Sequence, residues 1–239
     1  HPRHPYAGKL VFTAFSGSHQ DAINKGMQAR EERRSYVWEV PYLPIDPSDI
    51  GRRYEPVVRI NSQSGKGGVA FVMDNFYGFK LPKGMHKEFA DVIQEISEKQ
   101  GEVSPEQIME EFRNHYLERK EPLHFRKSVI TDTEAPDGSF ATKAIVTYTQ
   151  NGIEKVFEGV GNGPIDAVQR GLEEVLGAQL KVLDYSEHAL RSGSNAQAAS
   201  YIHLLDVKGG KATYGVGISS NITRASIRGL FSAVNRLFF

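Results

Sequence analysis

The sequence predicts an α+β protein in which a mainly helical segment precedes a domain built from two βββα units. Amphipathic helix patterns occupy residues 66–116, and alternating strand patterns begin at about residue 123. A strand–turn–helix pattern then occurs twice. Between the two parts, residues 117–122 are charged and end in proline, which is typical of a domain boundary.

The duplicated pattern lies in the last third of the chain. Its two copies pair Gly159-Val160-Gly161 with Gly215-Val216-Gly217 and Arg170-Gly171-Leu172 with Arg228-Gly229-Leu230. The copies are roughly 57 residues apart, a period that indicates a duplicated supersecondary unit packed against its twin. Chance recurrence in a glycine-rich chain is the alternative interpretation. We therefore expect a pseudo-symmetric domain, with the glycines of each triplet placed where the chain turns into the helix.

The first half of the chain contains one short strand pattern and several helix patterns. Leu10 to Phe15 is nearly all apolar, as in a fully buried strand, and a helix is predicted from Ala22 to Arg34. A one-turn helix follows Asp46 as its N-cap and ends at Gly51. Further helices are predicted at about residues 66–76 after Ser64, at residues 82–100, and from residue 105 after a Ser104 capping box.

The second half repeats one order of elements. The first unit is predicted as strands 123–131, 140–149 and 153–159 with a helix at 164–176. The second is predicted as strands 180–187, 198–207 and 211–217 with a helix at 223–237. Asn151-Gly152 and Gly209-Gly210 are two-residue hairpin signals. Two such units can bury their helices against their sheets.

Composition excludes several classes of protein. In the 239 residues, 29 Lys and Arg balance 29 Asp and Glu, so no global field favours nucleic acid or a membrane surface. There is no apolar run of transmembrane length. Without cysteine there are no disulfides, thiolate metal sites or cysteine nucleophiles, which fits a cytoplasmic protein. Because the chain begins with His1 and soon enters a strand pattern, we expect it to lack an N-terminal part.

Two motif interpretations fail on the residues present. A Walker A loop needs a glycine five residues before its Gly-Lys pair and a serine or threonine after the lysine. Ile60 and Gly67 occupy those places around Lys66, so nucleotide hydrolysis is rejected. His1 and His4 do not predict a metal site, because proline separates them and no acidic partner is near.

Three features remain as candidates for function. His19 lies where a buried strand pattern gives way to a helix, a common place for chemistry, although a capping role in the loop is an equal alternative. Tyr42 stands in a proline-rich segment and could present its hydroxyl group to a site or simply pack. The Gly161-Asn162-Gly163 backbone before a helix can approach an anion, or form a plain turn.

Several segments resemble the 2-isopropylmalate synthase family, in its longer-chain branch with the mycobacterial and corynebacterial enzymes. They are residues 12–23 (FTAFSGSHQDAI), 40–47 (VPYLPIDP), 61–69 (NSQSGKGGV), 161–164 (GNGP) and 183–189 (LDYSEHA). The resemblance covers essentially the whole chain in order. It implies part of an acyltransferase that joins acetyl-CoA and 2-oxoisovalerate into 2-isopropylmalate, the first committed step of leucine biosynthesis. It also implies a homodimer with feedback inhibition by L-leucine.

The resemblance also implies a domain division. Family chemistry occurs in a TIM barrel, on a divalent metal (Mg, Mn or Zn) held by a His-x-His pair and an aspartate. No His-x-His occurs in this sequence, so no cofactor is expected here and the chain alone is expected to be inactive. Residues 1–17 then correspond to the end of the barrel and 18–121 to helical linker subdomains. Residues 122–239 correspond to the leucine-binding domain, with repeats at about 123–177 and 178–239.

Two residues are implied in catalysis. In the family, the histidine of SGSHQD and the tyrosine of VPYLP reach into the partner subunit's active site, and here they are His19 and Tyr42. Enolising the methyl group of acetyl-CoA needs a general base, and the developing alkoxide needs a proton or hydrogen-bond donor. An imidazole suits the first role and a phenol the second, but the division of roles stays open.

The leucine site implied by the resemblance combines a glycine-rich helix start with an apolar cup. Its residues are Gly161, Asn162, Gly163, Pro164, Ile165, Val182, Tyr185, Ala189 and Ala198. The backbone at 161–163 suits the ligand carboxylate, and the alanines leave room for an isobutyl group, although they could equally serve tight packing. The first copy is expected to make the main contact, because Asn-Gly-Pro does not follow residue 217. The alternatives are a scaffold piece with a degenerate effector site and the equivalent region of a homocitrate or citramalate synthase.

Overall fold

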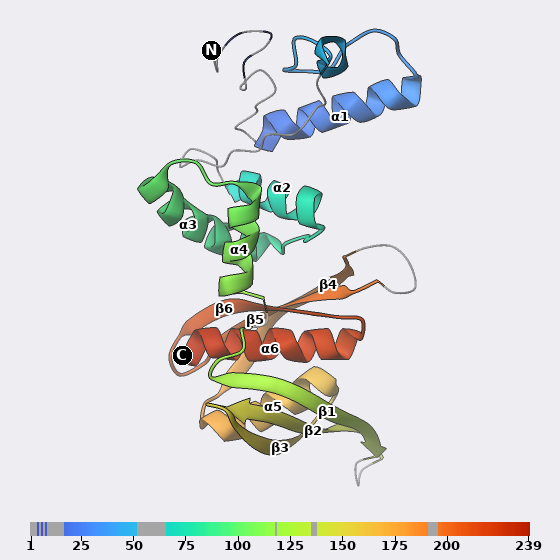
Figure 1. The fold of residues 1–239 in the computed structure, drawn as a ribbon. Helices are drawn as coiled ribbons and strands as arrows, with labels where there is room; N and C mark the ends of the chain where they lie inside the picture. Colours follow the sequence, from blue (N-terminus) through green and yellow to red (C-terminus); the bar gives the residue numbers. More distant parts are fainter. Residues whose placement is uncertain are drawn as a thin grey trace. The chain divides into compact units, whose positions relative to one another are not determined.

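The computed structural model describes residues 4, 6, 8, 17–51, 66–117, 119–134, 138–190 and 196–239. Its contacts divide the chain into two compact units, His1–Glu110 and Glu111–Phe239, which are described separately here (Figure 1). The predicted strand Leu10–Phe15, which suggested the end of a barrel, and the predicted cap Ser64 lie outside the described residues. Within the described ranges, no helix is both long and apolar enough to cross a membrane.

The first unit is helical, as predicted. It contains α1 (Gly17–Arg33), the 3-10 turn η1 (Pro47–Ile50), α2 (Lys66–Tyr77), α3 (Lys83–Gln100) and the start of α4 (Pro105–His115). The Ser104 capping box is confirmed, because Ser104 N donates to Gln107 Oε1 at 2.9 Å and Gln107 N donates to Ser104 Oγ at 3.3 Å. Gly101 ends α3 with φ +89°, a conformation that favours glycine.

One face of α3 forms a core against α2. The buried residues of this face are Met85, Phe89, Ile93 and Ser97. They recur at every fourth position, so they form a stripe along the helix. Val92 and Ile96 flank this stripe and are only partly buried.

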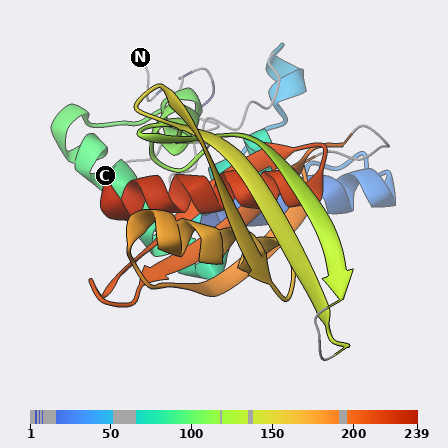
Figure 2. The same ribbon diagram turned by 90° about the horizontal axis from the view of Figure 1, so that it is seen from below.

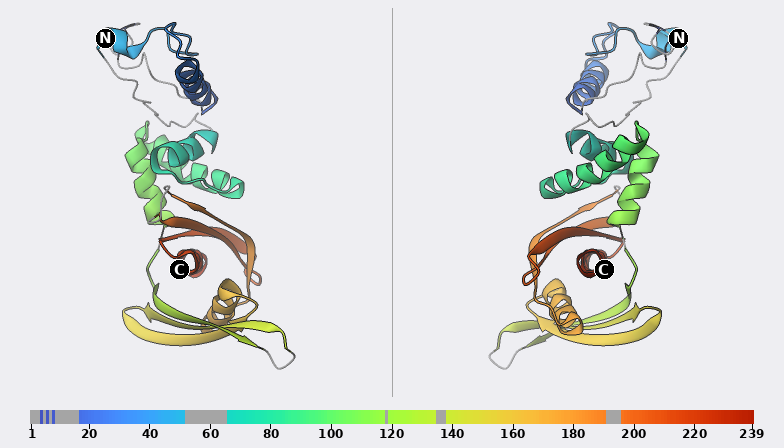
Figure 3. Two further views of the ribbon diagram at one scale, coloured as in Figure 1. Left: turned by 90° about the vertical axis from the view of Figure 1, so that its right-hand side faces the viewer. Right: turned by 90° about the vertical axis from the view of Figure 1, so that its left-hand side faces the viewer.

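The second unit confirms the α+β class with its two βββα units. The first βββα unit consists of β1 (Leu123–Glu134), β2 (Phe140–Gln150), β3 (Ile153–Gly161) and α5 (Pro164–Leu176). The second βββα unit consists of β4 (Leu180–Ala189), β5 (Ala198–Asp206), β6 (Lys211–Ser219) and α6 (Ile222–Phe238). Each sheet is antiparallel, in the orders β1-β2-β3 and β4-β5-β6. Figure 3 shows both helices between the two sheets, and Figure 2 shows them side by side.

Strand alternation and hairpin chemistry account for this architecture. Along β2, Ala144, Val146 and Tyr148 are buried in the core, which is the period of two expected for a strand with one core face. The β2–β3 turn uses Asn151 at φ +52° and Gly152 at φ +82°, as the Asn-Gly signal predicts. The same core includes residues of both helices and both sheets, so the two repeats fold as one domain.

The repeated glycines serve helix–strand contact. A Cβ on Gly159 would lie 2.0 Å from Ala167 O, and one on Gly217 would lie 2.1 Å from Ala225 O. Only glycine permits such an approach between a strand and a helix backbone. The strand was predicted to end at Gly159, with the turn at the glycines that follow. That prediction is wrong for Gly161, because β3 continues through this residue.

These contacts also correct the alignment of the repeats. Gly159 abuts Gly171 N, and Gly217 abuts Gly229 N in the same way. The counterpart of Gly159 is thus Gly217 rather than Gly215, which gives strand and helix one common offset of 58 residues (159 to 217, 171 to 229). The matching Gly-Val-Gly triplets are two residues out of register. The sequence conceals this slip, because a shift of two keeps every side chain on the same face of a strand.

Candidate functional site

The first unit brings His19 and Tyr42 together. His19 is the third residue of α1, so it lies inside the helix rather than in a loop before it. Tyr42 lies in the turn after Val40. Their ring centroids are 4.2 Å apart with the planes at 31°, and Tyr42 is 61% exposed. The two side chains therefore present an imidazole and a phenol to the same patch of solvent.

A small core explains why Tyr42 faces outward. Ile23 of α1 is buried together with Val40 and Leu43, which flank Tyr42 in sequence. Trp38 closes the turn by donating from Nε1 to Leu43 O at 2.8 Å. Because its neighbours are fixed in this core against α1, the Tyr42 ring is held beside the start of the helix.

Ionic contacts add a second attachment between this segment and α1. Arg30 forms an ion pair with Asp46 at 3.2 Å, and its guanidinium lies 4.9 Å from the Trp38 ring centroid. Partial burial opposes the ionisation of Asp46, but hydrogen bonds from Ser48 N and Oγ, with the Arg30 charge, hold its pKa below the ordinary value. Asp46 is also the predicted N-cap of η1, which is confirmed.

The backbone at Tyr42 is unusual. Its φ is +63°, a left-handed conformation that bulky residues rarely adopt. The preceding Pro41 packs so closely on α1 that a Cβ on Gly26 would lie 2.5 Å from Pro41 Cδ. Strained positions of this kind persist where surrounding packing over-determines them, and they are common at functional sites.

In the second unit, the start of α5 has an open backbone. Gly163 is the N-cap, has extended backbone (φ −176°) and offers no side-chain cap. A Cβ placed there would meet nothing within 4 Å. Asp166 instead turns back, and its Oδ2 accepts from Asn162 N at 2.8 Å, while Arg170 Nε donates to the same carboxylate at 3.2 Å. Sequence reasoning missed Asp166 as a site residue, although an acidic residue three positions after an N-cap is a recognisable signal.

Four of the expected residues lie on the helix-facing side of the second sheet: Val182, Tyr185, Ala189 and Ala198. The register shows this, because Tyr185 pairs with Ile202, whose side chain is in the core. A bulge between Val182 and Asp184 keeps Val182 and Tyr185 on one face despite their odd separation. The glycine-rich helix start and this apolar set come from different layers of the domain.

Tyr185 is tied to α6 through polar contacts. Its hydroxyl group donates to the Glu187 carboxylate and lies 3.1 Å from Ser226 Oγ, which also accepts from Ser200 Oγ at 3.2 Å. Burial, followed by the hydrogen bond to Glu187, raises the pKa of the Tyr185 phenol. The expected apolar cup therefore has a polar edge, and sequence reasoning did not identify Glu187 or Ser226 as part of it.

Two family descriptions match the chain in order. Residues 9–74 match "Alpha-isopropylmalate synthase, post-catalytic domain-like", and residues 102–238 match "LeuA allosteric (dimerisation) domain". The second match covers more than half of the chain. The chain belongs to the 2-isopropylmalate synthase family.

Relatives named 2-isopropylmalate synthase agree with this assignment. The chain is 48% identical over 238 residues to the one from Brucella suis and 47% identical over 240 residues to the one from Clostridium acetobutylicum. It is 49% identical over 245 residues to the one from Mycobacterium leprae. These alignments cover 98–99% of the chain but only 40–42% of each synthase, so the chain spans about two fifths of the length of these relatives.

The described residues do not fit the divalent metal that the resemblance to synthases implies. Among them, no three potential His, Asp or Glu ligands gather at one place. No His-x-His pair occurs in the sequence.

Proposed function

We propose that this chain is the linker and allosteric part of a 2-isopropylmalate synthase and that it binds L-leucine at the α5 start and the inner face of β4. One observation carries the leucine site. The α5 N-terminus has a bare Gly163 cap, whereas the equivalent cap of α6, Asn221, uses its own side chain to accept from Arg224 N. The match to an allosteric domain description supports the same conclusion.

The geometry offers each group that a free amino acid needs. Unpaired N–H groups at a helix start are donors for a carboxylate. The Asp166 carboxylate, beside this start, is an acceptor for the ligand ammonium group. Val182, Ala189 and Ala198 give a small apolar surface for the isobutyl group.

A second copy of the chain completes the proposed site. The α5 start and the β4 face belong to different layers, and the matching family description names the domain as a dimerisation domain. We infer a homodimer in which leucine is bound where the two allosteric domains meet. Leucine then lowers activity by favouring one of two states of the dimer.

We also propose that His19 and Tyr42 serve the active site of the partner subunit. Their rings lie 4.2 Å apart, so both can reach one substrate. The His19 imidazole would take a proton from the acetyl methyl group, and the Tyr42 hydroxyl would donate to the developing alkoxide. In the complete synthase, acetyl-CoA and 2-oxoisovalerate would bind in a barrel with its own divalent metal, outside this chain.

Calorimetry tests the effector. Leucine should release or absorb heat with the 239-residue chain, and isoleucine and lysine should bind more weakly. Gly163→Asp should abolish leucine binding without unfolding the domain, because the position is open and its backbone is extended. Binding that survives this change would show that the site is wrong. Preference for lysine would favour a homocitrate synthase, and no heat with any amino acid would favour a scaffold.

The second repeat provides a matched control. Asn221→Asp places a carboxylate at the equivalent N-cap of α6, where aspartate caps a helix as well as asparagine does. Leucine binding should be unchanged in this variant. If both variants lose it, the loss reflects charge on the domain rather than the α5 site.

The catalytic proposal needs a complete synthase that carries this chain. His19→Gln and Tyr42→Phe should each lower kcat by about 100-fold or more, the usual effect of losing a general acid or base. Leucine affinity should stay constant in both. Wild-type turnover in either variant would rule out these roles.

A further inference from the structure

A cationic pocket lies beside α6 in the second unit. The residues that line it are Arg119, Lys120, His124, Phe125, Arg228 and Phe231. They come from three places, namely the segment before β1, β1 itself and α6. The hollow is open to solvent and has a cavity volume of about 60 Å³.

The pocket is separate from the proposed leucine site. It involves β1 and α6, which are packed against each other, whereas the leucine site involves the α5 start and β4. In the sheets, β1 and β3 form opposite edges, and α5 packs on β3. The two sites therefore have no lining residue in common.

Hydrogen bonds hold the pocket walls in place. Arg228 Nη1 donates to Ile218 O at 2.6 Å, which fixes this guanidinium against the end of β6. The buried Asn235 Nδ2 donates to Arg119 O at 2.7 Å and to Leu123 O at 2.8 Å. The segment before β1 is thus attached to α6, and its two basic side chains are positioned by a fixed backbone. The Arg228 guanidinium, held by its hydrogen bond to Ile218 O before a ligand arrives, is a preorganised charge and binds at a smaller entropic cost.

Positive charge is concentrated here in a chain whose total is balanced. The basic residues in and around the pocket are Arg119, Lys120, Arg126, Arg224 and Arg228. No described carboxylate forms an ion pair with Arg119 or Lys120. The Arg224 guanidinium lies 5.9 Å from the Phe125 ring centroid, and its Nη2 donates to Arg126 O at 3.4 Å. Arg224 therefore belongs to this basic cluster.

His124 reports the electrostatic potential inside the pocket. Burial is the largest cause that lowers its pKa, and the charges of Arg126, Lys120 and Arg228 lower it further. Glu121 opposes them only in part. Burial alone accounts for part of this shift, and the contributions of the three cations show that positive charge lies near the His124 ring.

We propose that this pocket binds a phosphate-bearing small molecule with at least two negative charges. Arginine and lysine together suit phosphate oxygens, the first as a fork and the second as a point charge. The Arg119 and Lys120 donors come from the segment before β1, and the Arg228 donors come from α6, so the cations border the pocket from two sides. Phe231 and Phe125 are 2% and 6% exposed and form an apolar floor that strengthens each charged contact.

Calorimetry with inorganic pyrophosphate at low salt tests the proposal on the whole chain. One pyrophosphate should bind per chain, and higher salt should weaken it. The double change Arg119→Gln and Lys120→Gln should weaken binding by about tenfold or more, because it removes two charge-assisted contacts. Both side chains are exposed, so the variant should fold.

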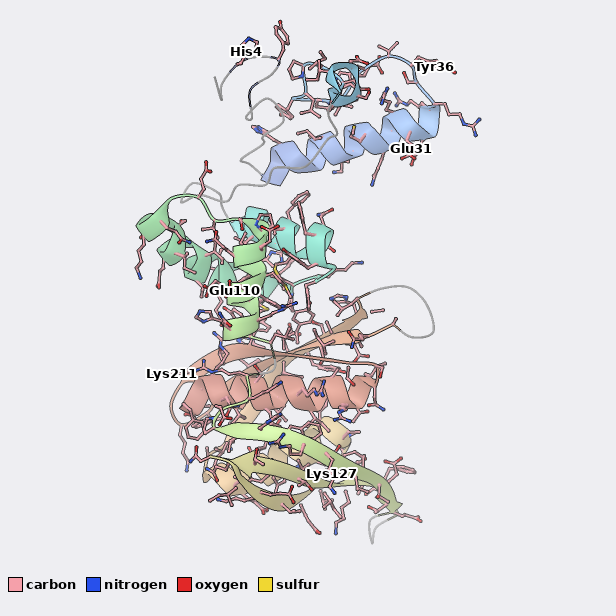
Figure 4. All side chains as sticks on the ribbon, in the orientation of Figure 1. His4, Glu31, Tyr36, Glu110, Lys127 and Lys211 are labelled. Carbon is pink, nitrogen blue, oxygen red and sulfur yellow. The ribbon has the colours of Figure 1, made fainter. Side chains whose placement is uncertain are left out.

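A matched control removes the same charge elsewhere. Lys208→Gln with Lys211→Gln changes two exposed lysines at the β5–β6 hairpin, where Figure 4 labels Lys211. This variant should bind pyrophosphate normally. An equal loss in both variants would mean that net charge alone attracts the anion, and it would overturn the pocket. Leucine binding should be unchanged by both double variants, so failure here is distinct from failure of the leucine site.

The affinities of other anions identify the chemical group that the pocket recognises. Citrate carries similar charge on planar groups, and equal affinity for citrate would overturn the phosphate assignment. Nucleoside diphosphate that binds more tightly than pyrophosphate would identify a nucleotide as the source, and equal affinity would identify the phosphate group alone. No heat from either phosphate compound would also overturn the proposal.

An observation on the unaltered chain provides a second test. Bound pyrophosphate should raise the pKa of His124 in an NMR titration, because it offsets the charges of the linker (Arg119, Lys120), β1 (Arg126) and α6 (Arg224, Arg228). The NMR signals of His188 and His203, on the other sheet, should not move when pyrophosphate is added. A His124 titration that ignores pyrophosphate would contradict the proposal.

Discussion

The two repeats of the second unit begin their helices at equivalent positions but complete them differently. Asn221 caps α6 with its own side chain, which accepts from Arg224 N at 2.9 Å. Gly163 starts α5 without a side chain, and Asp166 bonds back to Asn162 N instead. Duplication has kept the close strand–helix packing and changed the helix start. A repeated fold can therefore diverge in function at the few backbone groups that packing does not use.

The repeats also differ where their helices end. α5 stops at Gly177, which takes φ +62°. The equivalent position of α6 is Asn235, and there the helix continues. Asn235 is fully buried, accepts from Leu123 N at 3.0 Å and donates to Leu123 O at 2.8 Å. The second repeat thus ties the start of β1 to α6, whereas the corresponding position of the first repeat only ends α5.

Gly159→Ala and Gly217→Ala, one in each repeat, should cause the largest losses of unfolding free energy. Each added methyl group would lie about 2 Å from a helix carbonyl oxygen, and such overpacking costs about 3 kcal/mol of unfolding free energy. Urea unfolding measures it. Gly163→Ala, in open space, is the control and should cost less than about 1 kcal/mol, because it weakens the N-cap without a clash. A loss near the control value at Gly159 or Gly217 would refute the corrected alignment.

Asn235→Leu should cause the next largest loss of unfolding free energy, roughly 2–3 kcal/mol. The change leaves the buried N–H and C=O groups of Leu123 without their partner. Asn235→Asp keeps the acceptor for Leu123 N and should lie between wild type and Asn235→Leu in urea unfolding. Equal stability of all three proteins would show that α6 is not the anchor of the domain.

Loss of the Asn221 N-cap of α6 should lower the unfolding free energy by a smaller amount. Asn221→Ala should cost about 1 kcal/mol, because α6 loses the acceptor for Arg224 N. Asn221→Gly imitates the first repeat and should lie a few tenths of a kcal/mol from the wild type. Thermal unfolding of both variants would check the order, and a reversed order would mean that the cap is not formed in solution.

Acid should weaken the domain slightly through His124. Its pKa is lowered in the folded protein, chiefly by burial, from an ordinary 6.5. Below that pH the unfolded chain binds a proton that the folded chain resists, so stability is full above pH 6.5 and declines as the pH falls. Urea unfolding at neutral and mildly acidic pH should show a smaller decline for His124→Gln than for wild type. Identical declines would rule out this contribution.

Local signals account for the parts of the fold that were predicted well. The Ser104 capping box, the Asn151-Gly152 hairpin and the alternation in β2 each act within a few residues, so the sequence reveals them directly. The end of β3 was predicted too early, because a glycine that packs closely and a glycine that turns look the same in sequence.

Some residues of the candidate sites were likewise visible in the sequence, and others were brought together only by the fold. Sequence alone selected His19 and Tyr42, yet 23 positions separate them, and only the core of Ile23, Val40 and Leu43 brings their rings together. The cationic pocket had no sequence signal at all, because Lys120 and Arg228 lie far apart in the chain and each resembles an ordinary surface residue.

The sequence by itself determined that two βββα units follow a helical segment, and its segments identified the family. Those properties rest on periodicity and on neighbouring residues, which a linear chain displays. Tertiary structure alone decided which glycines face a helix, which helix start stays open and where positive charge gathers. These depend on how close distant backbones and charges come, and that distance is set only when the sheets close around α5 and α6.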